Sequence, residues 1–150
     1  MSSIPRLPRF LGVLVALPQL AAVGAMLTGP AAWREPAQAV ALTYAALALA
    51  MLGGSWWGIA AGAPAAERRG SLGWLWVAGA VPLLAGLASL PPWILGRIGP
   101  EPALIMLAAA LMLSAGVEAR LGPLAPRWWL ALRVPLGIAL GLATAGAAFV

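Results

Sequence analysis

Charged residues divide the chain into five long apolar intervals. The charge-free intervals are residues 10–33, 36–66, 70–96, 102–117 and 134–150. A helix that crosses a bilayer needs about 20 mainly apolar residues. The last two intervals are short, but they reach this length if Glu118 and Arg120 at one end, and the segment 129–133 at the other, extend toward the interface. The pattern therefore predicts an all-α integral membrane bundle forming a single domain over residues 1–150, with transmembrane helices near 9–28, 37–62, 72–90, 102–119 and 129–149.

Proline positions agree with these boundaries. Eleven of the fourteen prolines, Pro91 and Pro92 among them, fall outside the predicted helices or at their edges, where the missing N–H is least harmful. Pro18, Pro82 and Pro135 lie inside, and each should kink its helix. A kink could shape a cavity, but proline is common in membrane helices and we expect these three to serve packing.

The arginines give the bundle a predicted direction. Seven lie in the N-terminal tail and in or near the second and fourth loops, Arg133 being the one just beyond the fourth loop, against two in the first and third loops. The excess favours a cytoplasmic N-terminus and, with five spans, a periplasmic C-terminus. The Ala, Gly, Pro and Arg bias without Lys is typical of a GC-rich bacterial genome, which favours a bacterial inner membrane over an organelle. A cleaved signal peptide ending near Ala25 is the alternative at the N-terminus, but Pro18 and Gln19 favour an uncleaved first helix.

The composition removes most catalytic chemistry. The chain is 63% hydrophobic and 9% charged, its basic residues are all Arg and its acidic residues all Glu, and it has no His, Cys, Lys or Asp. A water-soluble fold, a hydrolytic triad, a thiolate nucleophile and the usual metal sites are therefore excluded. We expect no cofactor, no metal and no enzymatic activity. The scattered arginines of this chain indicate lipid headgroups, including anionic lipids, as partners rather than nucleic acid.

Two local patterns mark candidate sites. Six of the eight tryptophans lie near the predicted cytoplasmic helix ends, which favours an aromatic belt; the alternative is a ligand pocket backed by arginines such as Arg133. Trp56 and Trp57 point about 100° apart on a helix, so both cannot face lipid. Glu118 and Arg133 could pair across the last two helices, but we expect each to extend separately into the headgroups. The candidate packing, ligand or partner site consists of Tyr44, Gly53, Gly54, Trp56, Trp57, Gly58, Pro82 and Arg133.

The segment Leu52-Gly53-Gly54-Ser55-Trp56-Trp57-Gly58-Ile59-Ala60, eight residues after Tyr44, resembles the central motif of the domain of unknown function 3429 family, which includes transmembrane protein 69. Leu11-Gly12 leading to Pro18, Val81-Pro82-Leu83-Leu84-Ala85 and Leu132-Arg133 are similar to the family's other helices in the same order. The chain departs from the family pattern at Val15, Gln19, Met51 and Trp56. The resemblance implies a small multi-pass membrane protein, and it supplies no biochemical activity.

These observations leave three functional hypotheses. The first is a non-enzymatic membrane protein whose Gly/Trp segment packs the bundle or docks another membrane protein or a second copy, because small residues let helices approach closely. The alternative is a carrier or binding protein for a lipid-like or quinone-like apolar ligand. The third is an enzyme of lipid metabolism. It would have to use Glu67 or Glu118 as its acid/base group at the membrane interface, and the sequence shows no partner residue for either.

Overall fold

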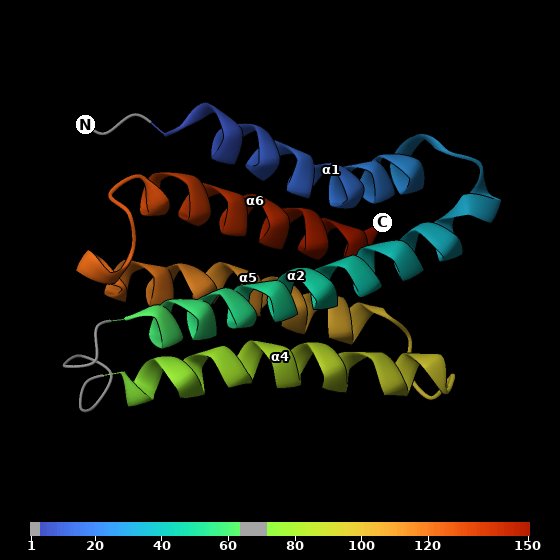
Figure 1. Cartoon of the computed structure of the whole chain (residues 1–150). Coiled ribbons are helices and arrows are strands. Elements are labelled where there is room, and N and C mark those ends of the chain that lie inside the picture. Colours follow the sequence, from blue (N-terminus) through green and yellow to red (C-terminus); the bar gives the residue numbers. More distant parts are fainter. Residues whose placement is uncertain (1–3, 64–71) are drawn as a thin grey trace.

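The computed structural model of the protein describes residues 4–63 and 72–150. In these residues, five long α-helices form an antiparallel bundle (Figure 1). They are α1 (Arg6–Thr28), α2 (Arg34–Gly62), α4 (Gly73–Ile94), α5 (Glu101–Arg120) and α6 (Trp129–Phe149). Short 3-10 turns, η1 (Ala31–Trp33) and η2 (Gly122–Leu124), precede α2 and α6. All five helices are long and apolar enough to cross a membrane. The predicted all-α membrane bundle is therefore confirmed.

The helix ends fall close to the predicted positions, with one clear difference in α4. This helix continues through Pro91 and Pro92 to Ile94, four residues beyond the predicted end. Proline lacks only the backbone donor, and its carbonyl still accepts, as the bond from Leu95 N to Pro91 O shows. The expectation that these two prolines lie at the edge of the helix was wrong, because a final helical turn can tolerate two missing donors.

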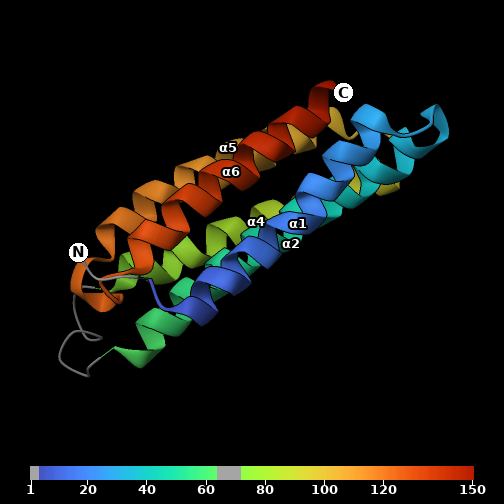
Figure 2. The ribbon, with the colours of Figure 1, turned by 90° about the horizontal axis from the view of Figure 1, so that it is seen from above.

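The helices are paired unevenly. The most extensive contacts join α5 to α6 and α2 to α4, α1 packs against both α2 and α6, and α4 and α5 touch over a much smaller area. α2 contacts each of the other four long helices. It runs obliquely from the α1 side to the α4 side in Figure 1, and Figure 2 shows it beneath α1 along one edge of the bundle. The weak α4–α5 contact leaves room between these helices.

One end of the bundle carries most of the described arginines. At this end, which we call the Arg-rich end, α1, α4 and α6 begin and α2 and α5 end (Figure 1). Arg34 and Arg97 lie at the opposite end, and Arg68 and Arg69 fall outside the described residues. The described arginines of the Arg-rich end are Arg6, Arg9, Arg120, Arg127 and Arg133.

Small residues bring α2 and α4 into backbone contact. A Cβ atom added to Gly53 would overlap the carbonyl oxygen of Gly79, and one added to Gly86 would lie 2.9 Å from the carbonyl oxygen of Ala46. Larger side chains at these places would push the two helices apart. Glycine is therefore required along this seam by close packing, as is common between membrane helices.

Polar side chains inside the bundle link α1 to its neighbours. Gln19, which is fully buried, donates through Nε2 to Thr144 Oγ1 at 2.9 Å, and the Tyr44 hydroxyl donates to the carbonyl oxygen of Val15. Hydrogen bonds of this kind hold membrane helices together where water cannot satisfy a polar group. Tyr44, a candidate site residue, thus joins α2 to α1.

Candidate functional site

The Gly/Trp segment lies in the second half of α2, and the helical repeat divides it between two faces. Gly53 and Trp56 are buried against the neighbouring helices, whereas Gly54 and Gly58 are exposed on the opposite side. A Cβ atom added to either of the exposed glycines would meet nothing within 4 Å. The segment therefore packs the bundle with one face and leaves a smooth strip on the other.

Trp56 reaches a carboxylate that is buried at the junction of three helices. Its Nε1 donates to Glu118 Oε1 at 3.1 Å, and the Nε1 of Trp129 donates to the other oxygen, Oε2. Glu118 is 1% exposed. Two indole donors thus replace water around this carboxylate, as burial of a charge requires.

Arg133 completes this arrangement from α6. Its Nε lies 3.5 Å from Glu118 Oε1, its Nη2 donates to Ser55 Oγ at 2.9 Å, and its guanidinium carbon lies 4.9 Å from the centroid of a Trp129 ring. We call Ser55, Trp56, Glu118, Trp129 and Arg133 the polar cluster. Glu118 and Arg133 pair across α5 and α6, so the expectation that each would extend separately into the headgroups was wrong. The cluster lies inside the bundle, where pairing with a carboxylate is the favourable alternative to solvation.

Trp57 occupies a different environment from Trp56, as their angular separation predicts. It is half-buried, its Nε1 donates to the carbonyl oxygen of Trp76 at 2.7 Å, and the two indole rings lie 6.3 Å apart. Trp57 therefore fastens α2 to α4 near the Arg-rich end. An aromatic belt agrees with the exposure of Trp33, Trp74 and Trp76. In contrast, Trp56 and Trp129 donate hydrogen bonds to Glu118 inside the bundle.

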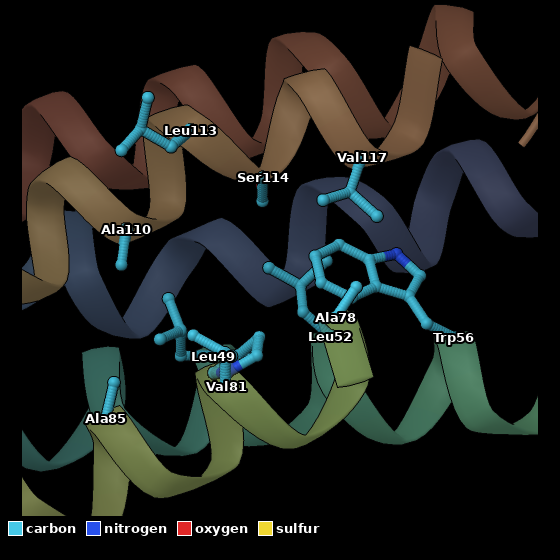
Figure 3. A pocket seen from close by; sticks show the side chains of 11 residues that line it. Leu49, Leu52, Trp56, Ala78, Val81, Ala85, Ala110, Leu113, Ser114 and Val117 are labelled. Atoms are coloured by element: carbon cyan, nitrogen blue, oxygen red, sulfur yellow. The ribbon is translucent and has the colours of Figure 1, made fainter. Parts of the chain in front are cut away.

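A groove of about 290 Å³ opens between α4 and α5, with α2 as its floor (Figure 3). We call it the lateral groove. Its walls are apolar except for one serine, whose hydroxyl donates to the Leu111 carbonyl oxygen at 2.6 Å. The lining residues are Leu49, Leu52 and Trp56 from α2, Ala78, Val81, Pro82 and Ala85 from α4, and Ala110, Leu113, Ser114 and Val117 from α5.

Trp56 belongs to both features. Its N–H group bonds to Glu118 in the polar cluster, while its ring forms a wall of the lateral groove, as the close-up shows (Figure 3). The cluster therefore fixes the orientation of a side chain that shapes the groove. Pro82, another candidate from the sequence, lines the groove on the α4 side.

The comparisons with known proteins identify a family. A family model described as "Protein of unknown function (DUF3429)" matches residues 4–149, nearly the whole chain. The chain belongs to the DUF3429 family. No curated protein and no solved structure matches it. The motif that indicated this DUF3429 membership from the sequence is the α2 segment that contributes Trp56 to both the cluster and the groove.

The polar cluster and the lateral groove of this DUF3429 protein differ in how far their surfaces are already occupied. Within residues 4–63 and 72–150, no group of three or more His, Cys, Asp or Glu side chains could hold a metal ion. Both oxygens of Glu118 already accept hydrogen bonds, so its carboxylate is occupied. The lateral groove, in contrast, offers apolar surface that no side chain of the described chain fills.

The candidate site predicted from the sequence contains four of the residues that shape these features, and the Glu118–Arg133 pair was an open alternative. Trp56, Pro82 and Arg133 were candidate site residues, and so was Gly53, which packs against Gly79 of α4. The groove walls on α5 were missed, because Ala110, Leu113 and Val117 are ordinary apolar residues of a membrane helix. Only their position beside the poorly packed edge of α4 gives them a role, and a linear pattern does not show which helices are neighbours.

Proposed function

We propose that this protein binds the apolar chain of a lipid-like or quinone-like molecule in the lateral groove, without bond-making chemistry. The observation that supports the proposal most directly is the groove itself. Its volume of about 290 Å³ is near the lower end of small-molecule sites, which have about 300–1,000 Å³. The groove lies between two helices that could span the membrane, so a ligand could enter from the bilayer without crossing water.

The chemistry of the lining supports an apolar occupant. The Ser114 hydroxyl donates within its own helix and the Trp56 N–H donates to Glu118. No side-chain donor among the lining residues is left to select a polar group. An acyl or isoprenoid chain needs no hydrogen-bond partner, and it gains dispersion contacts with the close-fitting walls.

Native mass spectrometry of gently extracted protein tests this function. We expect the wild-type protein to carry one lipid-like molecule per chain. Ala110→Phe, which places a ring in the groove, should remove this adduct, whereas Ala109→Phe on the exposed face of the same helix should retain it. An adduct that both variants retain equally, or a wild-type protein without one, would overturn the proposal.

A second candidate function is docking of another membrane helix on the exposed glycine strip. Gly54 and Gly58 are one helical turn apart on α2, and nothing lies within 4 Å of a Cβ atom added to either. Paired small residues are a common contact between membrane helices. Gly58→Leu should then weaken association in a bilayer cross-linking assay and leave the lipid adduct unchanged, and unchanged association would argue against docking.

We also propose a bacterial inner-membrane location, with the N-terminus in the cytoplasm and the C-terminus in the periplasm. The support is the excess of arginines at the Arg-rich end, where α1 begins. A phosphatase or fluorescent-protein fusion after Val150 tests the orientation. Phosphatase activity is expected at this position, and fluorescence from a cytoplasmic fluorescent protein would contradict it.

A further inference from the structure

Toward the Arg-rich end, each of the two helices that form the walls of the lateral groove carries one further side chain, Arg120 on α5 and Trp74 on α4. On α5, positions 110, 113, 117 and 120 follow each other at steps of three or four residues, which keeps them on one side of the helix. Arg120 therefore extends the α5 wall, about 4.5 Å of helical rise beyond Val117. On α4, Trp74 stands four residues before the wall residue Ala78 in the same way. The helical spacing thus places an indole and a guanidinium group at the Arg-rich ends of the two groove walls, which we call the mouth of the groove.

Both side chains are exposed at the Arg-rich end of the bundle. Arg120 is exposed, and Trp74 is 37% exposed. Arg120 is also the last residue of α5 and Trp74 is the second residue of α4, which places both at the level where a membrane-spanning helix meets the headgroups. Arg and Trp are favoured at this level because each has an apolar part and a polar part.

The positive charge of Arg120 is not neutralised within the described residues. Glu118 is the acidic residue nearest to Arg120 in the sequence, only two positions away. In residues 4–63 and 72–150, however, the ion pair of Glu118 is with Arg133. Because Arg133, Trp56 and Trp129 hold that carboxylate inside the bundle, Arg120 remains available to an anion from outside. Arg127, Arg9 and Arg6 add positive charge to the same end.

We propose that the occupant of the lateral groove is an anionic lipid, with one apolar chain in the groove and its phosphate at Arg120 beside Trp74. The inference rests on the proposed function and names the class of ligand for that site. A charged group in the apolar groove would lose its hydration without gaining a partner, and a hydrocarbon gains nothing from the charge of Arg120. An amphipathic molecule, with an apolar chain and an anionic group, fits both the walls and the mouth. Guanidinium is well suited to phosphate because its planar set of donors can form two parallel hydrogen bonds.

Two lipids that differ only in the phosphate provide the test. Binding of dioleoyl phosphatidic acid and of dioleoylglycerol to the full-length protein in detergent is measured by native mass spectrometry titration. We expect the phosphatidic acid to bind at least about tenfold more tightly, since a charge-assisted hydrogen bond is about twice as strong as a neutral one and each 1.4 kcal/mol is a factor of about ten. Arg120→Gln should remove this preference, and Arg127→Gln, at an exposed arginine of the same end, should retain it.

The Ala110→Phe variant and a phosphate competition distinguish a failure of the phosphate inference from a failure of the proposed function. Equal affinity for the two lipids, with both lost in Ala110→Phe, would overturn the phosphate inference and leave the groove as a site for apolar chains. Binding of both lipids that is unchanged in Ala110→Phe would overturn the proposed function itself. Competition by millimolar inorganic phosphate as effective as that by phosphatidic acid would show a site for free phosphate and contradict a lipid ligand.

Discussion

The polar cluster and the lateral groove share the Trp56 side chain and differ in almost everything else. In the cluster, each carboxylate oxygen of Glu118 accepts a hydrogen bond from an indole N–H. Arg133 forms an ion pair with Glu118 and donates a hydrogen bond to Ser55. In the groove, apolar walls face about 290 Å³ that no side chain of the described chain occupies. Most polar groups of the cluster therefore have internal partners, although the buried Nε of Arg133 forms no hydrogen bond, whereas the groove has no internal occupant.

This difference separates a structural role from a binding role within one motif. A buried site in which both carboxylate oxygens and both indole donors are engaged holds helices in place, because breaking one of these contacts leaves a buried polar group unpaired. The groove, in contrast, presents apolar surface that no side chain of the described chain covers. The unfilled groove is thus the more informative of the two regions for function, and the cluster explains how its Trp56 wall is held.

The largest effect should come from breaking the ion pair in the cluster. Glu118→Gln leaves the Arg133 guanidinium without its counter-ion inside the bundle, and we expect a loss of about 3 kcal/mol in unfolding free energy. Denaturant unfolding in detergent micelles measures it. The double variant Glu118→Gln/Arg133→Met should recover much of the loss, and a double variant no more stable than Glu118→Gln would show that the pair is not the cause.

A smaller effect is expected at the seam between α2 and α4. A Cβ atom on Gly53 would overlap the backbone of Gly79, whereas one on Gly54 meets nothing. Gly53→Ala should therefore cost about 1–3 kcal/mol through overpacking. Gly54→Ala should be neutral or stabilising, since alanine favours helix over glycine by up to about 1 kcal/mol. Thermal unfolding of the two variants side by side checks this, and equal effects would contradict the packing described for α2.

The smallest effect should separate the two roles of Trp56. Trp56→Phe removes the N–H donor to Glu118 but keeps an aromatic wall, so we expect a loss of about 1–2 kcal/mol in stability and little change in lipid occupancy. Trp56→Leu removes the donor and the ring and should also change the occupancy of the groove. The same unfolding and mass measurements apply to both, and an identical occupancy in the two variants would show that the ring does not shape the groove.

The sequence was sufficient to predict the helices but not the way they pair. Charge spacing and proline positions placed all five spans, because a membrane helix must be long, apolar and internally hydrogen-bonded. The Glu118–Arg133 pair was an alternative that the sequence left open, since residues 15 positions apart meet only if α5 and α6 are neighbours. The groove depends on the poor contact between α4 and α5, which no local pattern reports.

The central claim is that a lipid chain lies inside the lateral groove rather than only around the bundle. Photolabelling in vesicles, with a phospholipid that carries a diazirine in its acyl chain, tests it most directly. Leu52 and Pro82 line the groove and are buried, whereas Leu84 on the same helix as Pro82 is 62% exposed. We predict labels on Leu52 and Pro82 as well as on Leu84, with the first two lost in Ala110→Phe. Labels confined to Leu84 and other exposed positions would contradict the account.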